Sequence, residues 1–88
     1  MDKVLIFSED CLSVIGCDKS YSGAIIIPEG VEYIANNAFY GCESLTSIHI
    51  PDGVKEIGNG AFCRCFNLTS INIPERITKI GDSAFAES

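Results

Sequence analysis

The residues in this sequence with the most reactive side chains are its cysteines and its one histidine. Cys63 and Cys65 stand one residue apart, with Cys42 and His49 earlier in the chain. Thiolates and imidazoles bind zinc, two thiols can join as a disulfide, and a thiol of lowered pKa acts as a nucleophile. Zinc sites usually show Cys-x-x-Cys spacing, which this sequence lacks. Core packing is the favoured interpretation of Cys42 and Cys65, with a disulfide or a metal site as less favoured alternatives.

The five cysteines are an odd number, so they cannot all pair within one chain. A bond between Cys11 and Cys17 is conceivable, but nothing in the pattern requires it. Free thiols are typical of intracellular proteins, and the first residues lack the long apolar stretch of a secretory signal. As it stands, the sequence predicts a cytoplasmic location, but a piece of a longer exported protein would look the same, so the compartment stays open.

A catalytic role for His49 would need a nucleophile and an acid that orients the ring. Ser47 and Ser70 lie at suitable strand positions, but these segments contain no aspartate or glutamate. The glycines form no phosphate-binding motif, and the acidic residues do not follow the spacing of a calcium loop. We therefore expect a protein that is not an enzyme and has no cofactor and no metal. An enzyme that uses Cys63 or Cys65 as a nucleophile is a distant alternative.

The composition further limits the classes of partner that the chain is expected to bind. The chain has 88 residues, of which 47% are hydrophobic and 20% are charged, and its net charge is −6. Such a chain is predicted to fold as one small domain. Nucleic acids and anionic membranes bind basic surfaces, so neither is an expected partner. No apolar run approaches the roughly 18 residues of a membrane-spanning helix.

The elements that must position these side chains are set by a repeat. Proline recurs every 23 residues, at Pro28, Pro51 and Pro74, and residues 28–50 and 51–73 are identical at more than half of their positions. One unit of this length cannot bury its apolar residues alone, but stacked coils can. The repeat therefore predicts aligned columns of core residues: Val31, Val54 and Ile77; Ile34, Ile57 and Ile80; Phe39, Phe62 and Phe85.

Each unit is predicted to divide into a turn, a short extended piece, one or two helical turns and a strand. Pro-x-Gly is turn chemistry, and the segments 45–50 and 68–73 alternate as strands with Ile48 and Ile50 inward and His49 outward. Strands repeated in one direction predict a parallel sheet. Asn36, Asn59 and Asp82 precede the Ala-Phe pairs and are preferred helix caps, so one or two helical turns are expected there.

The string I-P-x-x-V-x-x-I-x-x-x-A-F-x-x-C-x-x-L-T-S-I-x-I, carried by residues 23–88, resembles the BspA-like (type 5) leucine-rich repeats of bacterial surface proteins and several protozoan parasites. The resemblance implies an α/β fold, a short right-handed β/α solenoid with a parallel sheet. It also implies adhesion or protein–protein contact rather than catalysis, at a cell surface or after secretion.

The two ends of the array differ. Residues 1–22 do not fit the repeat, and two apolar runs, 3–7 and 12–15, predict a β-hairpin that caps the stack. The domain therefore divides into this cap and the repeats at 23–88, whose third unit stops at Ser88. An exposed apolar edge invites pairing. We expect either a homodimer or a truncated array, with the edge formed by Leu68, Ile71, Ile73 and Phe85.

The outward positions of the predicted sheet form a small uncharged strip, and exposed sheet faces of repeat proteins commonly bind partners. A plain solvated strip is the equally weighted alternative. The leading functional prediction is a module that binds another protein, whose identity stays open. A structural fragment that only associates with itself is the second hypothesis. The strip consists of Ala24, Ile26, Ser47, His49, Ser70 and Asn72.

Overall fold

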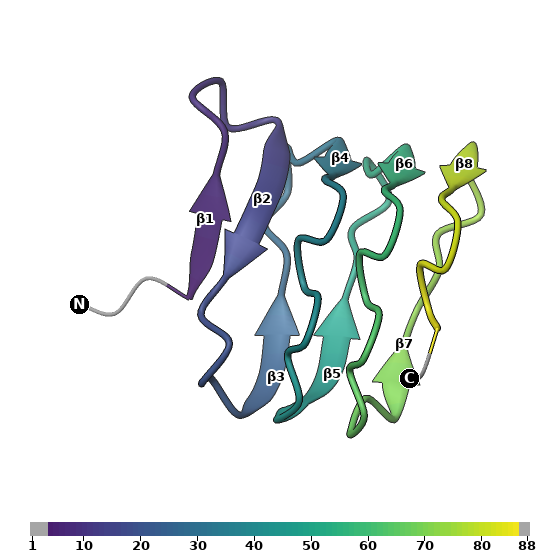
Figure 1. The fold of residues 1–88 in the computed structure, drawn as a ribbon. Helices are drawn as coiled ribbons and strands as arrows, with labels where there is room; N and C mark the ends of the chain where they lie inside the picture. The colour runs from purple at the N-terminus through teal and green to yellow at the C-terminus, as the bar shows by residue number, and fades with distance from the viewer. Residues whose placement is uncertain (1–3, 87–88) are drawn as a thin grey trace.

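The computed structural model describes residues 4–86, which form eight β-strands joined by turns (Figure 1). We call residues 28–50, 51–73 and 74–86 the first, second and third coils. Lys3 and Ser88, which the repeat and hairpin predictions include, lie outside the described residues. The strands are β1 (Leu5–Phe7), β2 (Ser13–Cys17), β3 (Gly23–Ile26), β4 (Tyr33–Ile34), β5 (Leu45–His49), β6 (Glu56–Ile57), β7 (Ser70–Ile71) and β8 (Lys79–Ile80).

Two sheets run along the stack, and the first and second coils each contribute one strand to both. Strands β3, β5 and β7 form a parallel sheet in which Ile25, Ile48 and Ile71 are in register. The second sheet has the order β1-β2-β4-β6-β8 and is parallel from β2 onward. The predicted parallel sheet is thus confirmed. The short extended pieces of the repeat form the second sheet, which the sequence pattern did not resolve.

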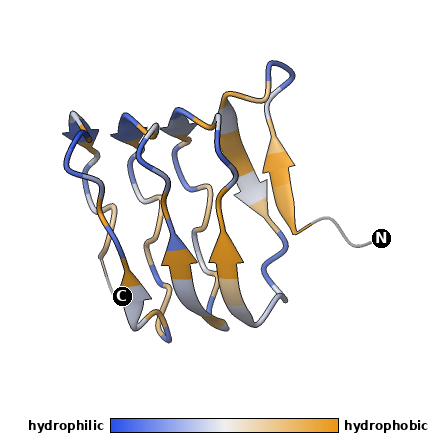
Figure 2. Cartoon of the chain, turned by 180° about the vertical axis from the view of Figure 1, so that it is seen from behind, coloured by the Kyte–Doolittle hydropathy of each residue, from blue (hydrophilic) through white to orange (hydrophobic). Residues whose placement is uncertain are grey.

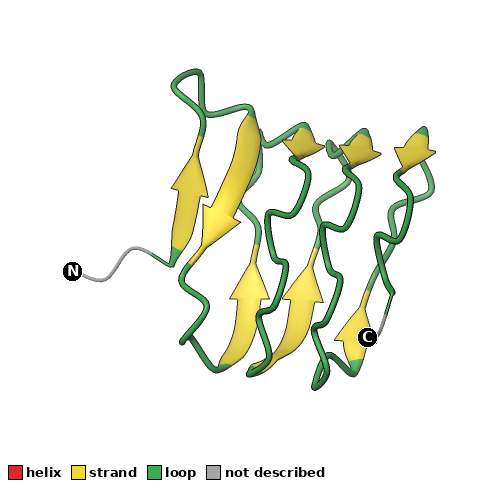
Figure 3. Ribbon diagram, viewed as in Figure 1, coloured by secondary structure: helices red, strands yellow, loops and turns green. Residues whose placement is uncertain are grey.

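The predicted helical turns are wrong, because the described residues contain no helix and each Ala-Phe segment is a series of turns (Figure 3). In the first coil the N–H groups of Asn37 and Phe39 donate to carbonyls of the second coil. The N–H groups between and after them, on Ala38 and Tyr40, donate three residues back within their own coil. None of these four N–H groups donates to the carbonyl four residues earlier, which is the bond that defines an α-helix. The α/β class is therefore replaced by an all-β solenoid.

A column of left-handed residues also interrupts any helix in these segments. The φ angle is 60° at Asn37, 65° at Gly60 and 58° at Ser83. These three residues occupy one position of the repeat, and a right-handed helix requires negative φ at every residue. The turn is therefore a property of the repeat itself.

The residues predicted as helix caps instead connect successive coils. The side-chain oxygen of Asn36 accepts the Asn59 N–H at 2.7 Å, and that of Asn59 accepts the Asp82 N–H at 2.8 Å. Each bond satisfies a backbone donor that a helix would otherwise leave unpaired at its start. The short asparagine side chain places this oxygen within reach of the backbone of the next coil.

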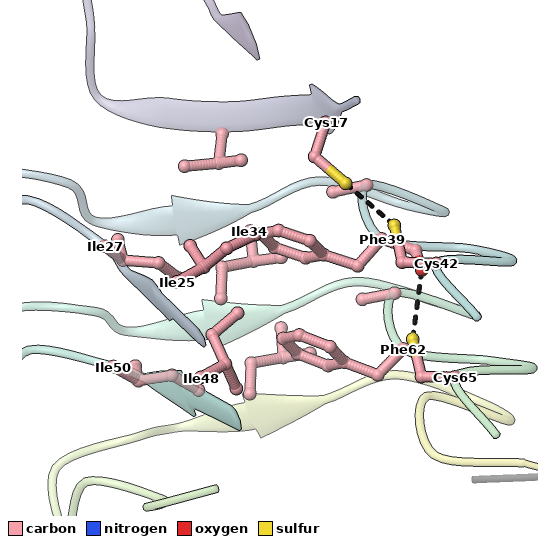
Figure 4. Close-up of a cluster of buried hydrophobic side chains, with 14 of the residues drawn as sticks. Cys17, Ile25, Ile27, Ile34, Phe39, Cys42, Ile48, Ile50, Phe62 and Cys65 are labelled. Atoms are coloured by element: carbon pink, nitrogen blue, oxygen red, sulfur yellow. Dashed lines mark hydrogen bonds between the residues drawn. The ribbon is translucent and has the colours of Figure 1, made fainter. Parts of the chain in front are cut away.

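The core lies between the two sheets and the Ala-Phe turns. Phe39 and Phe62 are fully buried, and the three phenylalanine rings stack with centroid separations of 4.9 and 5.3 Å. The predicted phenylalanine column is therefore confirmed, and isoleucines from both sheets pack against the rings (Figure 4). Stacked aromatic rings bury more area than any other side chains in the repeat.

The N-terminal residues form the predicted hairpin. Strand β1 pairs antiparallel with β2, and β2 continues the second sheet with Val14 in register with Ile34. At the turn, Asp10 accepts hydrogen bonds from the Ser8 hydroxyl and the Leu12 N–H, and the Ser8 bond lowers the pKa of the Asp10 carboxyl. Val14 is completely buried, so this end of the core is covered.

Within residues 4–86, no helix is of a length and polarity that would let it cross a lipid bilayer.

Candidate protein-binding face

The outward face of the sheet β3-β5-β7 holds the six strip residues that the sequence predicts. Register places Ala24, Ser47 and Ser70 side by side, and Ile26 lies across from His49. Five of the six are exposed, and Ser47 is half-buried. We call this set the contact strip; it consists of Ala24, Ile26, Ser47, His49, Ser70 and Asn72.

Ile26 is the most prominent apolar side chain of the contact strip. It is 73% exposed, more than any other large hydrophobic residue of the described chain. Its neighbours Ile25 and Ile27 are buried, because alternate residues of a strand point to opposite faces. The hydrophobic stretches of β3 and β5 stand out in Figure 2. Ile26 therefore lies in the open on a strand whose other side is anchored in the core.

Asn72 has a different role from the other strip residues. Its side-chain amide donates to the Ile50 carbonyl at 2.8 Å and accepts the Ile50 N–H at 2.9 Å. Both polar atoms of the amide are therefore engaged with the backbone of the preceding coil just after β5. These two hydrogen bonds connect the second coil to the first just past the end of β7, and they hold the Asn72 side chain in place.

The opposite sheet presents a charged surface. Glu32 and Lys55 form an ion pair at 3.1 Å, and the exposed Glu56 and Lys79 are adjacent in the ladder of β6 and β8. Beside them, Tyr33 is half-buried. Both sheets follow the same repeat, yet the outward side chains are charged on one and uncharged on the other. The contact strip is thus a distinct surface of the molecule.

The C-terminal edge predicted from the sequence is only partly covered. Ile73 is 41% exposed, whereas Leu68, Ile71 and Phe85 are half-buried. Ile80 of the third coil, which the predicted edge did not include, is 45% exposed. The repeat could have revealed the exposure of Ile80. Its counterparts Ile34 and Ile57 are each buried by the coil that follows, and no described coil follows Ile80.

The cysteines that suggested chemistry lie in separate surroundings. Cys42 and Cys65 are buried in the core, and the Cys65 thiol donates to the Phe39 carbonyl at 3.1 Å. Burial raises the pKa of Cys65 to about 11, which disfavours the thiolate. Cys63 is half-buried and Cys11 is exposed. The described residues include no group of three or more His, Cys, Asp and Glu side chains placed to hold a metal ion.

Sequence analysis missed the nearest sulfur contact, which joins Cys17 to Cys42 at 2.7 Å. The spacing of these residues is 25 rather than the 23 of the repeat, so no alignment of the units places them together. A depression of about 380 Å³ was also unforeseen, and it is lined by Asp52, Glu75 and Arg76 at the turns. It is open and polar, and His49 does not line it.

Comparison with known proteins agrees with this architecture. The family model described as a BspA type leucine rich repeat region (6 copies) matches residues 17–88. The crystal structure of the leucine rich repeat protein of T. pallidum superposes with a TM-score of 0.77 and 31% sequence identity. That match covers 94% of this chain but 42% of the T. pallidum chain. A search of functionally curated proteins gave no significant match.

The family match spans most of the chain and includes the Ala-Phe turns and both kinds of strand. The hairpin strand β1 precedes the matched region, while β2 reaches it at Cys17. The stacked phenylalanine rings and the parallel ladders show that the repeated sequence forms repeated structure. The chain therefore belongs to the family of BspA-type leucine-rich repeats.

Proposed function

We propose that this chain is a non-enzymatic module that binds another protein through the contact strip. The observation that supports the proposal most is the exposure of Ile26 at 73% on an uncharged sheet face. An exposed aliphatic side chain among uncharged neighbours matches the centre of a protein interface, where charged residues are depleted. The charged outer surface of the other sheet lacks this composition.

The strip is also presented rigidly. Ala24, Ser47 and Ser70 lie on paired strands, and the Asn72 amide fixes the backbone after β5. A surface that is ordered before binding loses little conformational entropy when a partner docks. This rigidity favours recognition of a folded partner of complementary shape. We extend the proposal to adhesion outside the cell, because BspA-like repeats resemble this chain and occur in bacterial surface proteins.

The test compares two isoleucines that are both exposed on strands. Ile26→Glu places a charge in the contact strip, and Ile15→Glu places the same charge on β2, where Ile15 is 48% exposed. Both variants must keep the circular dichroism spectrum and sedimentation of the parent chain. With a partner identified by cross-linking, Ile26→Glu is expected to weaken binding at least about tenfold.

Ile15→Glu is expected to leave the affinity of that partner nearly unchanged. His49→Glu should weaken binding less than Ile26→Glu, since it replaces a polar side chain at the side of the apolar centre. Equal affinities for Ile26→Glu and the parent chain would contradict the proposal. An equal loss in both isoleucine variants would place the binding surface elsewhere.

The exposed C-terminal end of the stack supports a second candidate, self-association through the C-terminal edge. Ile73 and Ile80 are 41% and 45% exposed there, and apolar surface next to unpaired strand edges favours pairing. We expect concentration-dependent dimers in sedimentation equilibrium, and we expect Ile80→Lys to abolish them while Ile6→Lys on β1 does not. A monomer at high concentration would contradict this candidate without affecting the contact strip.

A further inference from the structure

Two buried thiols meet where the hairpin joins the repeats. The Cys17 and Cys42 sulfur atoms are 2.7 Å apart, and both cysteines are free (Figure 4). Cys17 is the last residue of β2 and is 8% exposed, while Cys42 ends the Ala-Phe turn of the first coil and is 1% exposed. These sulfur atoms lie closer together than any other pair recorded among the described residues.

The repeat explains why these two thiols meet. In the second coil, the Cys65 thiol donates to the Phe39 carbonyl of the preceding coil. The first coil has no phenylalanine coil before it, because the hairpin occupies that place. Cys17 supplies the missing partner, and Cys42 contacts a sulfur atom where Cys65 contacts an oxygen. The cysteine at this repeat position therefore contacts a carbonyl oxygen in the second coil and a second thiol in the first.

Lys19 holds the segment after Cys17 against the same turn. Its ammonium group donates to the Tyr40 carbonyl and lies 6.0 Å from the centre of the Tyr40 ring. The hydrogen bond from the Cys17 thiol lowers the pKa of Cys42; the positive charge of Lys19 adds to this effect, while burial and the Asp18 carboxylate oppose it. The neighbouring Cys42 sulfur raises the pKa of Cys17. The lowered pKa favours the Cys42 thiolate, which is the form that acts as nucleophile in disulfide chemistry.

We propose that Cys17 and Cys42 form an intramolecular disulfide when the chain meets a two-electron oxidant such as hydrogen peroxide. The Cys42 thiolate attacks one peroxide oxygen, which breaks the O–O bond, and the displaced hydroxide takes up a proton to leave as water. The Cys17 sulfur then attacks the sulfenic acid sulfur and displaces a second water. Overall, two thiols and one peroxide yield one disulfide and two waters.

The bond would fasten the hairpin to the first coil. A disulfide has an S–S length of about 2.05 Å, so the sulfur atoms must approach by less than about 1 Å from their present separation. The bond would close a loop between residues 17 and 42 that contains β3 and β4. Closing a loop of this size restricts the unfolded chain and raises the melting temperature by about 10 °C or more.

The experiment uses the full chain with Cys11→Ser and Cys63→Ser, which removes the exposed and half-buried thiols. Cys42 then has two possible partners, Cys17 and Cys65. The reduced protein is treated with hydrogen peroxide, alkylated, digested and analysed by mass spectrometry without reductant. The expected product is a Cys17–Cys42 peptide in monomeric protein, with Cys65 alkylated after unfolding. The oxidised protein should melt at the higher temperature, and reductant should reverse the shift.

Two further variants complete the test. Adding Cys17→Ala should abolish both the cross-link and the shift in melting temperature, and adding Cys65→Ala should preserve both. The far-ultraviolet circular dichroism of each variant verifies that it is folded. The proposal is overturned if Cys42 pairs with Cys65, if all three thiols remain free after oxidation, or if the Cys17–Cys42 bond forms without raising the melting temperature.

Discussion

The second and third coils share the isoleucine, glycine and Ala-Phe positions of the repeat, yet the isoleucine and phenylalanine side chains differ sharply in burial. Ile57 is 1% exposed and its counterpart Ile80 is 45% exposed. Phe62 lies between two stacked rings, whereas Phe85 stacks on one. At these shared positions the difference follows from the neighbours, because the second coil has a coil on each side. In a solenoid, the contribution of a residue to stability depends on its position in the stack as much as on its type.

The opposite end of the molecule supports the same conclusion. Val14 is in register with Ile34 and is completely buried, although β2 carries no full copy of the repeat. The hairpin strand β1 lies outside it and is hydrophobic along its length (Figure 2). A covering strand therefore suffices to bury one end of the stack. The third coil has no such cover within the described residues, and its core position Ile80 is exposed.

The largest expected effect comes from truncating the stacked rings. Phe62→Ala should lower the free energy of unfolding by about 3–5 kcal/mol, because the side chain is fully buried and leaves a cavity. Phe85→Ala should cost less than half as much, since Phe85 is half-buried. Urea unfolding followed by circular dichroism measures both. Phe62→Leu provides a milder variant that remains folded. Equal losses of unfolding free energy at Phe62 and Phe85 would contradict the shared interior.

A smaller effect is expected at the glycine that allows the first and second coils to approach. A Cβ atom on Gly58 would lie 2.5 Å from the Asn36 backbone nitrogen, so Gly58→Ala forces the coils apart at a cost of about 1–3 kcal/mol. Gly81→Ala creates a similar clash with Asn59. The third coil packs on one side only and can shift, so the loss there should be smaller. A larger loss at Gly81 would mean that the third coil is the more rigid one.

Substitutions in the asparagine column should differ still less in their effect on the free energy of unfolding. Asn59→Ala removes the acceptor of the Asp82 N–H and should cost about 1 kcal/mol. Asp82→Ala should be nearly neutral, because the described chain offers no later coil whose backbone its side chain could bind. Urea midpoints of the two variants measured in one buffer test this. A loss for Asp82→Ala as great as for Asn59→Ala would show that the bond between coils is not what stabilises this column.

The smallest effect is expected from the ion pair on the charged sheet. The hydrogen bond and charge of Glu32 raise the pKa of Lys55 above its ordinary value of 10.5. The pair therefore stabilises the fold below pH 10.5, and this stabilisation is lost as pH rises through the raised pKa. The difference in urea midpoint between the parent chain and Lys55→Met should shrink between pH 9.5 and pH 11.5. The equivalent position in the third coil, Thr78, has no charge, and Thr78→Val should show no such pH dependence.

The sequence predicts the parts of the fold that every coil repeats. The period places Phe39, Phe62 and Phe85 in one column, and alternation directs Ile48 inward and His49 outward, as observed. The same register predicts the positions of the contact strip. These inferences succeed because stacking brings identical positions together, so that one local pattern determines a contact between distant residues.

Other features depend on interactions that no local pattern contains. Asn36 and Asn59 have the residue type of helix caps, but their side chains bind the next coil, and the backbone of the turn does the same. The left-handed column of Asn37, Gly60 and Ser83 is the one local signal against a helix, since asparagine and glycine tolerate positive φ. The Cys17–Cys42 contact was hidden because the hairpin lies outside the repeat.

The most direct test of the stacking account is amide hydrogen exchange measured residue by residue, at a concentration where the chain is monomeric. The Phe39 N–H donates to Ala61 and the Phe62 N–H to Ala84, both across coils. Both amides should exchange at the rate of global unfolding. The Phe85 N–H faces no further coil within the described residues and should exchange many times faster. Equal protection at Phe62 and Phe85, or fast exchange at Phe39 and Phe62, would contradict the account.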